Sequence, residues 1–213
     1  MKIRWHGNAC FEVSNSQYRI VIDPHDGKSI GIKPPILNAD IVLVTHDHFD
    51  NNAIRAVRGN FATVFAETGI TEIKGMKVEG FHTFHDEVGG NIRGENVIYR
   101  FEMDGISVCH CGGLGDMPSD EVVEALKGVD IIFIPTGETF TISMEKLEMF
   151  LERIDPKVMV PMGYKVGSIT IPLRTLDEFL EDVSDDMILY VGNEVELSGE
   201  DLSEFLGLWV FDY

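Results

Sequence analysis

The chain has 213 residues, of which 44% are hydrophobic, and this proportion excludes a mainly disordered protein. Its net charge of −19 is unevenly spread, because residues 1–106 carry 11 Lys and Arg against 14 Asp and Glu whereas residues 107–213 carry 6 against 22. So negative a field disfavours nucleic acid and anionic membrane surfaces as partners, and leaves small molecules or proteins.

Short β-type segments dominate the first half of the chain. Each is rich in β-branched or aromatic residues and lies between turn signals. The predicted strands are 2–5, 10–13, 18–22, 41–44, 63–65, 77–79, 97–101 and 106–109. Loops are expected at 23–35 and 88–94.

The second half alternates helices with strands. Amphipathic patterns predict helices at 119–126, 143–154 and 175–183, and apolar runs predict strands at 131–134 and 158–160. Ser119 and Ser143 occupy N-cap positions, and Glu121 and Glu145 follow in the first turns. Because the predicted strands come first and the helices mostly later, we expect an α+β fold with helices outside a pair of sheets, built as one domain over 1–213.

No run of apolar residues approaches the length of a membrane helix, and the first four residues do not begin a signal peptide. We therefore expect a cytoplasmic protein. Cys10, Cys109 and Cys111 are odd in number, and residues two apart on a strand are poor disulfide partners, so reduced thiols are expected.

The most informative segment follows the apolar run 41–44. His46, His48 and Asp50 occur there at alternate positions, so two imidazoles and a carboxylate meet at the carboxyl end of a buried strand. These are ligand types and spacings that suit a metal ion. The alternative is a polar turn after a core strand, but the density of histidines favours a metal site.

Several motifs together resemble the metallo-β-lactamase fold superfamily, and within it the branch of L-ascorbate-6-phosphate lactonase and other metal-dependent hydrolases. The resemblance extends over nearly the whole chain and implies an αββα sandwich of four layers, with the metal site at one edge between the sheets. The segments that carry it are 5–11, 22–24, 45–50, 85–96, 109–115, 134–143 and 161–165.

The family's ligand pattern is only partly present. The resemblance assigns His46, His48 and His85 to a first metal and Asp50 to a second. Asn51, Gly113 and Gly163 stand where the family has a His, a bridging Asp and a last His, and Asn8 replaces a His of the opening motif. The resemblance thus implies at most one metal ion.

Three neutral imidazoles still form the ligand set of a catalytic zinc site, which leaves one position for water. We expect zinc, with manganese or iron as alternatives, or no metal at all. Asp50 is the predicted catalytic residue, as general base or to orient the water. Alternatively, Asp50 only caps the turn or accepts a hydrogen bond from a ligand His.

Several other residues are candidates for metal ligands. Asp116, Glu138 or Cys111 could replace a lost ligand, although solvated acids and a buried core thiol are the simpler interpretations. His82 lies three residues before His85, on the opposite face if the strand continues, so only one of them faces the metal, and the motif after His85 selects it. The remaining histidines are expected to be structural, with His110 nearest the ligands; they are His6, His25 and His110.

Two functions remain open from the sequence. One is a mononuclear hydrolase that acts on a small ester, lactone or amide. The other is a non-catalytic protein that keeps the fold to bind a small ligand or a protein partner. A third, weaker hypothesis places iron on His46, His48 and Asp50. The sequence leaves a homo-oligomer open and does not identify the substrate.

Overall fold

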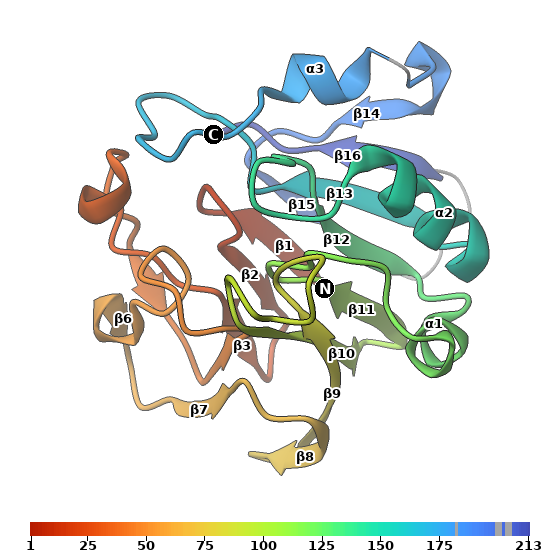
Figure 1. Ribbon diagram of the computed structural model, residues 1–213. Coiled ribbons are helices and arrows are strands. Elements are labelled where there is room, and N and C mark those ends of the chain that lie inside the picture. The colour runs from red at the N-terminus through yellow and green to blue at the C-terminus, as the bar shows by residue number, and fades with distance from the viewer. Residues whose placement is uncertain (182, 199–201, 203–205) are drawn as a thin grey trace.

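Two β-sheets pack face to face in this computed structural model, which describes residues 1–181, 183–198, 202 and 206–213 (Figure 1). In spatial order, the first sheet contains β15 (Glu194–Glu196), β1 (Lys2–Trp5), β2 (Phe11–Ser14), β3 (Arg19–Ile22), β5 (Ile41–Val44) and β7 (Ala62–Phe65). Its strands are antiparallel from β15 to β3 and parallel from β3 to β7.

The second sheet is larger. In spatial order it contains β14 (Ile188–Tyr190), β16 (Gly207–Val210), β13 (Val158–Met162), β12 (Ile131–Pro135), β11 (Ile106–His110), β10 (Glu95–Met103), β9 (Met76–Phe84) and β8 (Gly69–Ile73). The strands from β14 to β11 are parallel and those from β11 to β8 are antiparallel. A separate short pair joins β4 (Leu37–Asn38) and β6 (Val57–Arg58).

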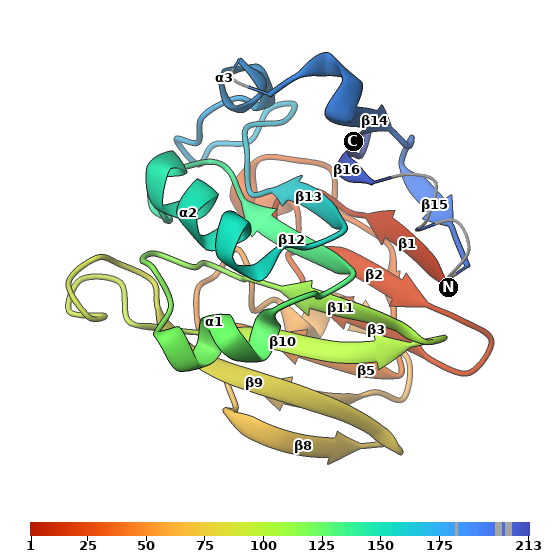
Figure 2. The ribbon, with the colours of Figure 1, turned by 90° about the vertical axis from the view of Figure 1, so that its right-hand side faces the viewer.

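The helices lie mainly outside the second sheet. Figure 2 shows α1 (Asp120–Leu126) and α2 (Met144–Ile154) across its outer face, and α3 (Leu176–Leu180) lies beyond β14. Ser119 caps α1 by accepting a hydrogen bond from Val122, whereas Ser143 takes the N-cap position of α2 without a side-chain bond. None of the described helices has the length and apolar character needed to cross a bilayer.

The outer face of the first sheet carries no α-helix among the described residues. It is covered by the β4–β6 pair and by the 3-10 turn Ile54–Ala56. The other 3-10 turn, Lys28–Ile30, packs elsewhere, because Ile30 lies in a separate cluster with Ile32 and Ile169. The sequence of β5 is apolar throughout because both faces of the strand are buried. Ile41 and Leu43 face the core between the sheets, while Val42 and Val44 face the outer cover.

The predicted α+β class with paired sheets is confirmed, and most predicted strands agree with the structure to within a few residues. The helix predicted at 175–183 ends earlier, at Leu180, and residue 182 lies outside the described part of the chain. The strands not predicted are the short β4 and β6, the edge strand β8, and the C-terminal β14, β15 and β16. Because β15 extends the first sheet and β14 and β16 extend the second, the C-terminal segment completes both.

Candidate functional site

Three histidines converge where the two sheets meet. His46 and His48 follow β5, and His85 follows β9. Their ring centroids are 4.6–4.8 Å apart, and each ring offers a nitrogen within 4.8 Å of those of the other two. A tetrahedral zinc ion with bonds of about 2.0 Å needs nitrogens roughly 3.3 Å apart, so a small closure of the rings would complete the set.

His46 is held by a buried hydrogen-bonded chain that starts in the neighbouring parallel strand. The Thr45 hydroxyl donates to Asp23 Oδ2 at 2.7 Å and lies 2.8 Å from His46 Nδ1, while the Thr45 amide donates to Asp23 Oδ1 at 2.8 Å. When Asp23 is ionised, the single hydroxyl hydrogen goes to Asp23, so Thr45 Oγ1 accepts from His46 Nδ1–H and Nε2 keeps a free lone pair. The sequence analysis missed both Thr45 and Asp23 as site residues.

Burial shifts the pKa values of the three histidines and of Asp23. It lowers the pKa of His46 and His48, and that of His85 to about 4, with the neighbouring His48 and Arg93 adding to the effect at His85. All three rings are therefore neutral at pH 7, the form that binds metals. Burial also raises the pKa of Asp23 to about 8, against the two hydrogen bonds from Thr45; a cation held by the histidines would lower it again.

Three positions where the resemblance implies a missing family ligand lie around this cluster. The Asn51 amide nitrogen is 3.2 Å from His46 Nε2, so it meets the lone pair that a metal would take. Gly113 lies against His85: a Cβ atom at position 113 would be 2.6 Å from His85 Nε2. Gly163 has a φ of +65° and open space where its Cβ would be. The structure therefore has room for His85 only because residue 113 has no side chain.

Asp50 lines the same cavity but lies outside the histidine cluster. Asn8 fixes it, because its amide nitrogen is 3.2 Å from both the Asp50 carbonyl oxygen and Oδ2. Asn8 itself has a φ of +51°, a left-handed conformation that asparagine tolerates better than most residues. Since Asp50 is absent from the cluster, the structure does not bring together the set His46, His48 and Asp50 considered for iron.

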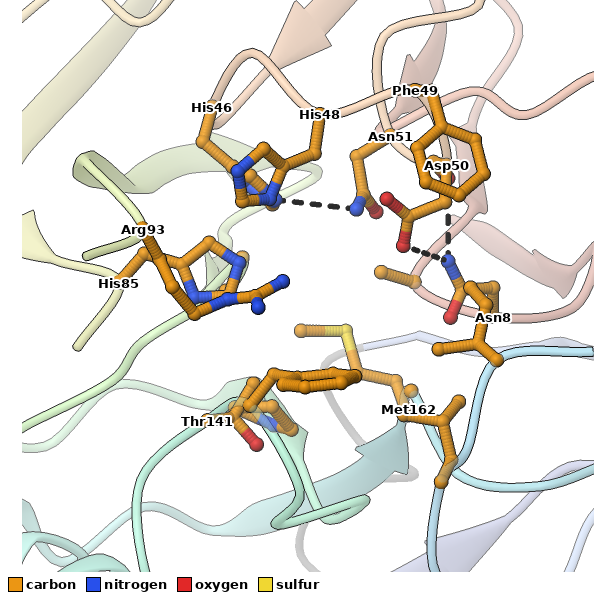
Figure 3. Close-up of a pocket in the computed structure, with 18 of the residues that line it drawn as sticks. Asn8, His46, His48, Phe49, Asp50, Asn51, His85, Arg93, Thr141 and Met162 are labelled. Carbon is orange, nitrogen blue, oxygen red and sulfur yellow. Dashed lines mark hydrogen bonds between the residues drawn. The ribbon is translucent and has the colours of Figure 1, made fainter. Parts of the chain in front are cut away.

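A cavity of about 370 Å³ opens over the histidines (Figure 3). It lies at the carboxyl ends of parallel strands from both sheets, since the segments after β5, β11 and β13 all reach it. Apart from the histidines, its charged side chains are Asp50 and Arg93. The apolar wall is made by Phe49, Phe140, Met162, Ile171, Pro172 and Leu173.

The loop after His85 is organised by one carboxylate. Asp86 accepts hydrogen bonds from the backbone amides of Val88, Gly90, Ile92 and Arg93, at 2.7–2.9 Å. These bonds hold the pKa of Asp86 down at about 2. The loop thereby carries Arg93 to the cavity, where its guanidinium carbon lies 4.1 Å from the centroid of the Phe140 ring. The sequence predicted a loop at 88–94 but did not identify this anchoring.

The other histidines lie away from the cluster, as expected. His82 is 45% exposed on the far side of β9, with Nε2 3.5 Å from Glu95. His110 is fully buried and bonds the backbone of Ala9 and Gly112 through its two ring nitrogens, so it lies behind the cavity wall. His25 bonds the carbonyl of His6.

The three residues considered as replacement ligands also lie elsewhere. Asp116 pairs with Lys146 at 2.7 Å, and Glu138 pairs with Arg174, both outside the cavity lining. Cys111 is buried in the core between the sheets, and all three cysteines are unpaired. Within the described part of the chain, the only group that could hold a metal is His46, His48 and His85.

Comparisons with known proteins agree with this architecture. A UPF0173 metal-dependent hydrolase of Thermococcus onnurineus is 27% identical, over 92% of this chain and 100% of its own. A crystal structure from Thermotoga maritima, assigned to the Zn-dependent hydrolases of the metallo-β-lactamase superfamily, is 33% identical with a TM-score of 0.78, covering 99% of this chain and 97% of its own.

A more distant structure, an isothiocyanate hydrolase from Delia radicum gut bacteria, shares the fold at 16% identity, with a TM-score of 0.65 over 85% of this chain and 91% of its own. The model of the β-lactamase superfamily domain matches residues 2–163, which include every residue of the histidine cluster and its supports. The chain therefore belongs to the β-lactamase superfamily.

Proposed function

We propose that this protein is a metal-dependent hydrolase with one metal ion on His46, His48 and His85, and that it hydrolyses a small ester, lactone or amide. The observation that carries the proposal is the convergence of three neutral imidazoles at the base of a largely apolar cavity. The relatives from Thermococcus and Thermotoga, named as a metal-dependent hydrolase and assigned as a Zn-dependent one, support the same class.

The donor set fits zinc best. Three imidazole nitrogens suit a four-coordinate ion with one position left for water, and carboxylates, which manganese and magnesium prefer, are missing from the cluster. When bound, such an ion lowers the pKa of a water molecule to about 7 and polarises a carbonyl oxygen. Manganese and iron remain alternatives that a metal assay distinguishes.

The chain's own residues supply orientation and a proton acceptor. Thr45 and Asp23 hold the tautomer of His46 in which Nε2 can bind a metal. Asn8 holds the Asp50 carboxylate at Oδ2, which leaves Oδ1 for the attacking water, from which Asp50 would accept a proton. Asn51 must turn away from His46 Nε2 when a metal binds.

The contact between Asn51 and His46 also favours a second function. An amide N–H already satisfies the His46 lone pair at 3.2 Å, which is the arrangement expected in a protein that uses this cavity to bind a small ligand without a metal. The two functions differ in metal content, so one measurement separates them.

The test is elemental analysis of untagged protein that is purified without chelator and then equilibrated with zinc, manganese and iron in turn. The hydrolase predicts about one tightly held ion per chain, and hydrolysis of a panel of small esters, lactones and amides by the loaded protein. Two ions per chain would show that the second site is intact. A folded protein without metal would refute the hydrolase and leave the ligand-binding function.

A further inference from the structure

Arg93 is a cation without an anion. None of the described residues places a carboxylate within 4.0 Å of its guanidinium, whereas Arg4, Arg19, Arg100, Arg153 and Arg174 all have such a partner. Arg55 and Arg58 lack one too, but both are exposed to water. Arg93 is half-buried and lines the cavity, and its Nε atom is buried without a hydrogen-bond partner in the described structure.

The unpaired polar atoms of the protein concentrate at this cavity. Six buried side-chain nitrogen or oxygen atoms have no hydrogen-bond partner among the described residues, and four of them belong to residues of the cavity lining. These four are Asn51 Oδ1, His85 Nδ1, Arg93 Nε and Thr141 Oγ1. Buried polar groups are normally satisfied, so such a concentration indicates the place where a polar ligand binds.

Arg93 is also held in position before any ligand binds. The Asp86 carboxylate fixes the backbone amide of Arg93 at 2.7 Å, and the Phe140 ring lies against the guanidinium at 4.1 Å. Figure 3 shows the guanidinium beside the His85 ring and directed into the cavity. A cation that is already ordered loses little side-chain entropy when it pairs with an anion, which strengthens the pair.

The charge of the site matches a singly charged anion. Arg93 contributes one positive charge, Asp50 lies in the same lining, and the chain as a whole carries −19. The fork of guanidinium N–H groups fits a planar carboxylate, and the Thr141 hydroxyl adds a donor. In the protein freed of metal by chelation, a doubly charged phosphate would meet the same single cation in a more repulsive field.

From these observations we infer that Arg93 recognises a carboxylate on the substrate, so that the cavity selects small carboxylic acids with an apolar body. The carboxylate would pair with Arg93, and the apolar body would pack on Phe140, Met162 and Leu173. A cavity of about 370 Å³ is at the lower end for small-molecule sites. The inference rests on the proposed function only in stating that an ester, lactone or amide bond elsewhere in the bound acid is then hydrolysed.

The test measures binding rather than turnover, with three probes of similar shape: phenylacetate, phenylacetamide and phenyl phosphate. We expect phenylacetate to bind at least about tenfold more tightly than phenylacetamide, as charge-assisted hydrogen bonds allow. Arg93→Gln should abolish this preference, and Arg58→Gln, which changes an exposed arginine, should leave it intact. In ¹⁵N-labelled wild type, phenylacetate should shift the Arg93 Nε–H resonance, a result that does not depend on the folding of a variant.

Repeating the titrations after dialysis against EDTA separates this inference from the hydrolase. A preference for phenylacetate that survives chelation and depends on Arg93 supports the inference even if no substrate is ever hydrolysed. Equal binding of phenylacetate and phenylacetamide, or an unchanged preference in Arg93→Gln, would overturn it. Tighter binding of phenyl phosphate than of phenylacetate would overturn the choice of carboxylate.

Discussion

Thr45→Val is the sharpest test of how the histidine cluster is held. Valine matches threonine in shape but cannot hydrogen bond, so the variant removes the contacts of Thr45 Oγ1 with Asp23 at 2.7 Å and His46 at 2.8 Å. Both partners are buried, Asp23 fully and His46 with 3% exposed. The Asp23 bond from the Thr45 amide remains, because it belongs to the backbone.

The expected magnitude follows from the two groups left without partners. A buried polar atom that loses its partner costs about 1–3 kcal/mol, so two of them should lower the free energy of unfolding by about 2–6 kcal/mol. Because His46 also loses the bond that sets its tautomer, metal affinity should fall by roughly 10–100-fold. Urea unfolding and competition with a coloured chelator measure the two effects separately.

Thr45→Ser is the matched control, since it keeps the hydroxyl and loses only a methyl group. It should retain nearly all of the metal affinity. The reasoning would be refuted by a Thr45→Val protein that binds metal as tightly as the wild type, or by a Thr45→Ser protein that binds as weakly as Thr45→Val.

Three further predictions concern the cluster and its surroundings. His48→Ala should abolish metal uptake while His82→Ala leaves it unchanged, as elemental analysis would show; the reverse would mean that the wrong face of β9 was chosen. Asp50→Asn should lower the rate of hydrolysis by about 10²–10⁴-fold without loss of bound metal, and a variant that loses the metal would show Asp50 to be a ligand. The pKa of Asp86 lies at about 2, below its unfolded value, so its stabilising effect is complete above about pH 4 and declines as the pH falls toward 2. Asp86→Asn should flatten this part of the curve of stability against pH, and an unchanged acid limb would count against the role of Asp86 in holding the loop.

The sequence predicted those strands and helices whose own residues have a clear pattern of buried and exposed positions. β5 has four buried residues in a row between polar turns, and α2 has a clear apolar face, so both were located closely. β8 and β14 could not be found this way, because neither has a fully buried residue to produce an alternating pattern. Their pairing with β9 and β16 gives them their strand conformation.

The histidine cluster was predictable because strand periodicity lets only one of His82 and His85 face the site, and the motif after His85 selects His85. The residues that hold the cluster in place could not be predicted from the sequence. Asp23 and Thr45 are 22 residues apart and meet only because β3 and β5 are parallel neighbours with Ile22 opposite Leu43. Arg93 was not predicted as a site residue, since nothing in a loop sequence shows that Asp86 will accept hydrogen bonds from four backbone amides and direct the arginine inward.

Gly113 connects the incomplete ligand pattern that the resemblance implies with the recognition proposed for Arg93. A side chain at residue 113 would start 2.6 Å from His85 Nε2, so a carboxylate there and His85 in its present place exclude one another. Without that carboxylate, and with Asn51 in place of a histidine, the lining of the cavity contains a single acidic side chain, Asp50. An acidic group at residue 113 would lie beside His85 and oppose an incoming anion close to Arg93. The loss of a second metal site and the admission of a carboxylate substrate would then be two consequences of the same substitution.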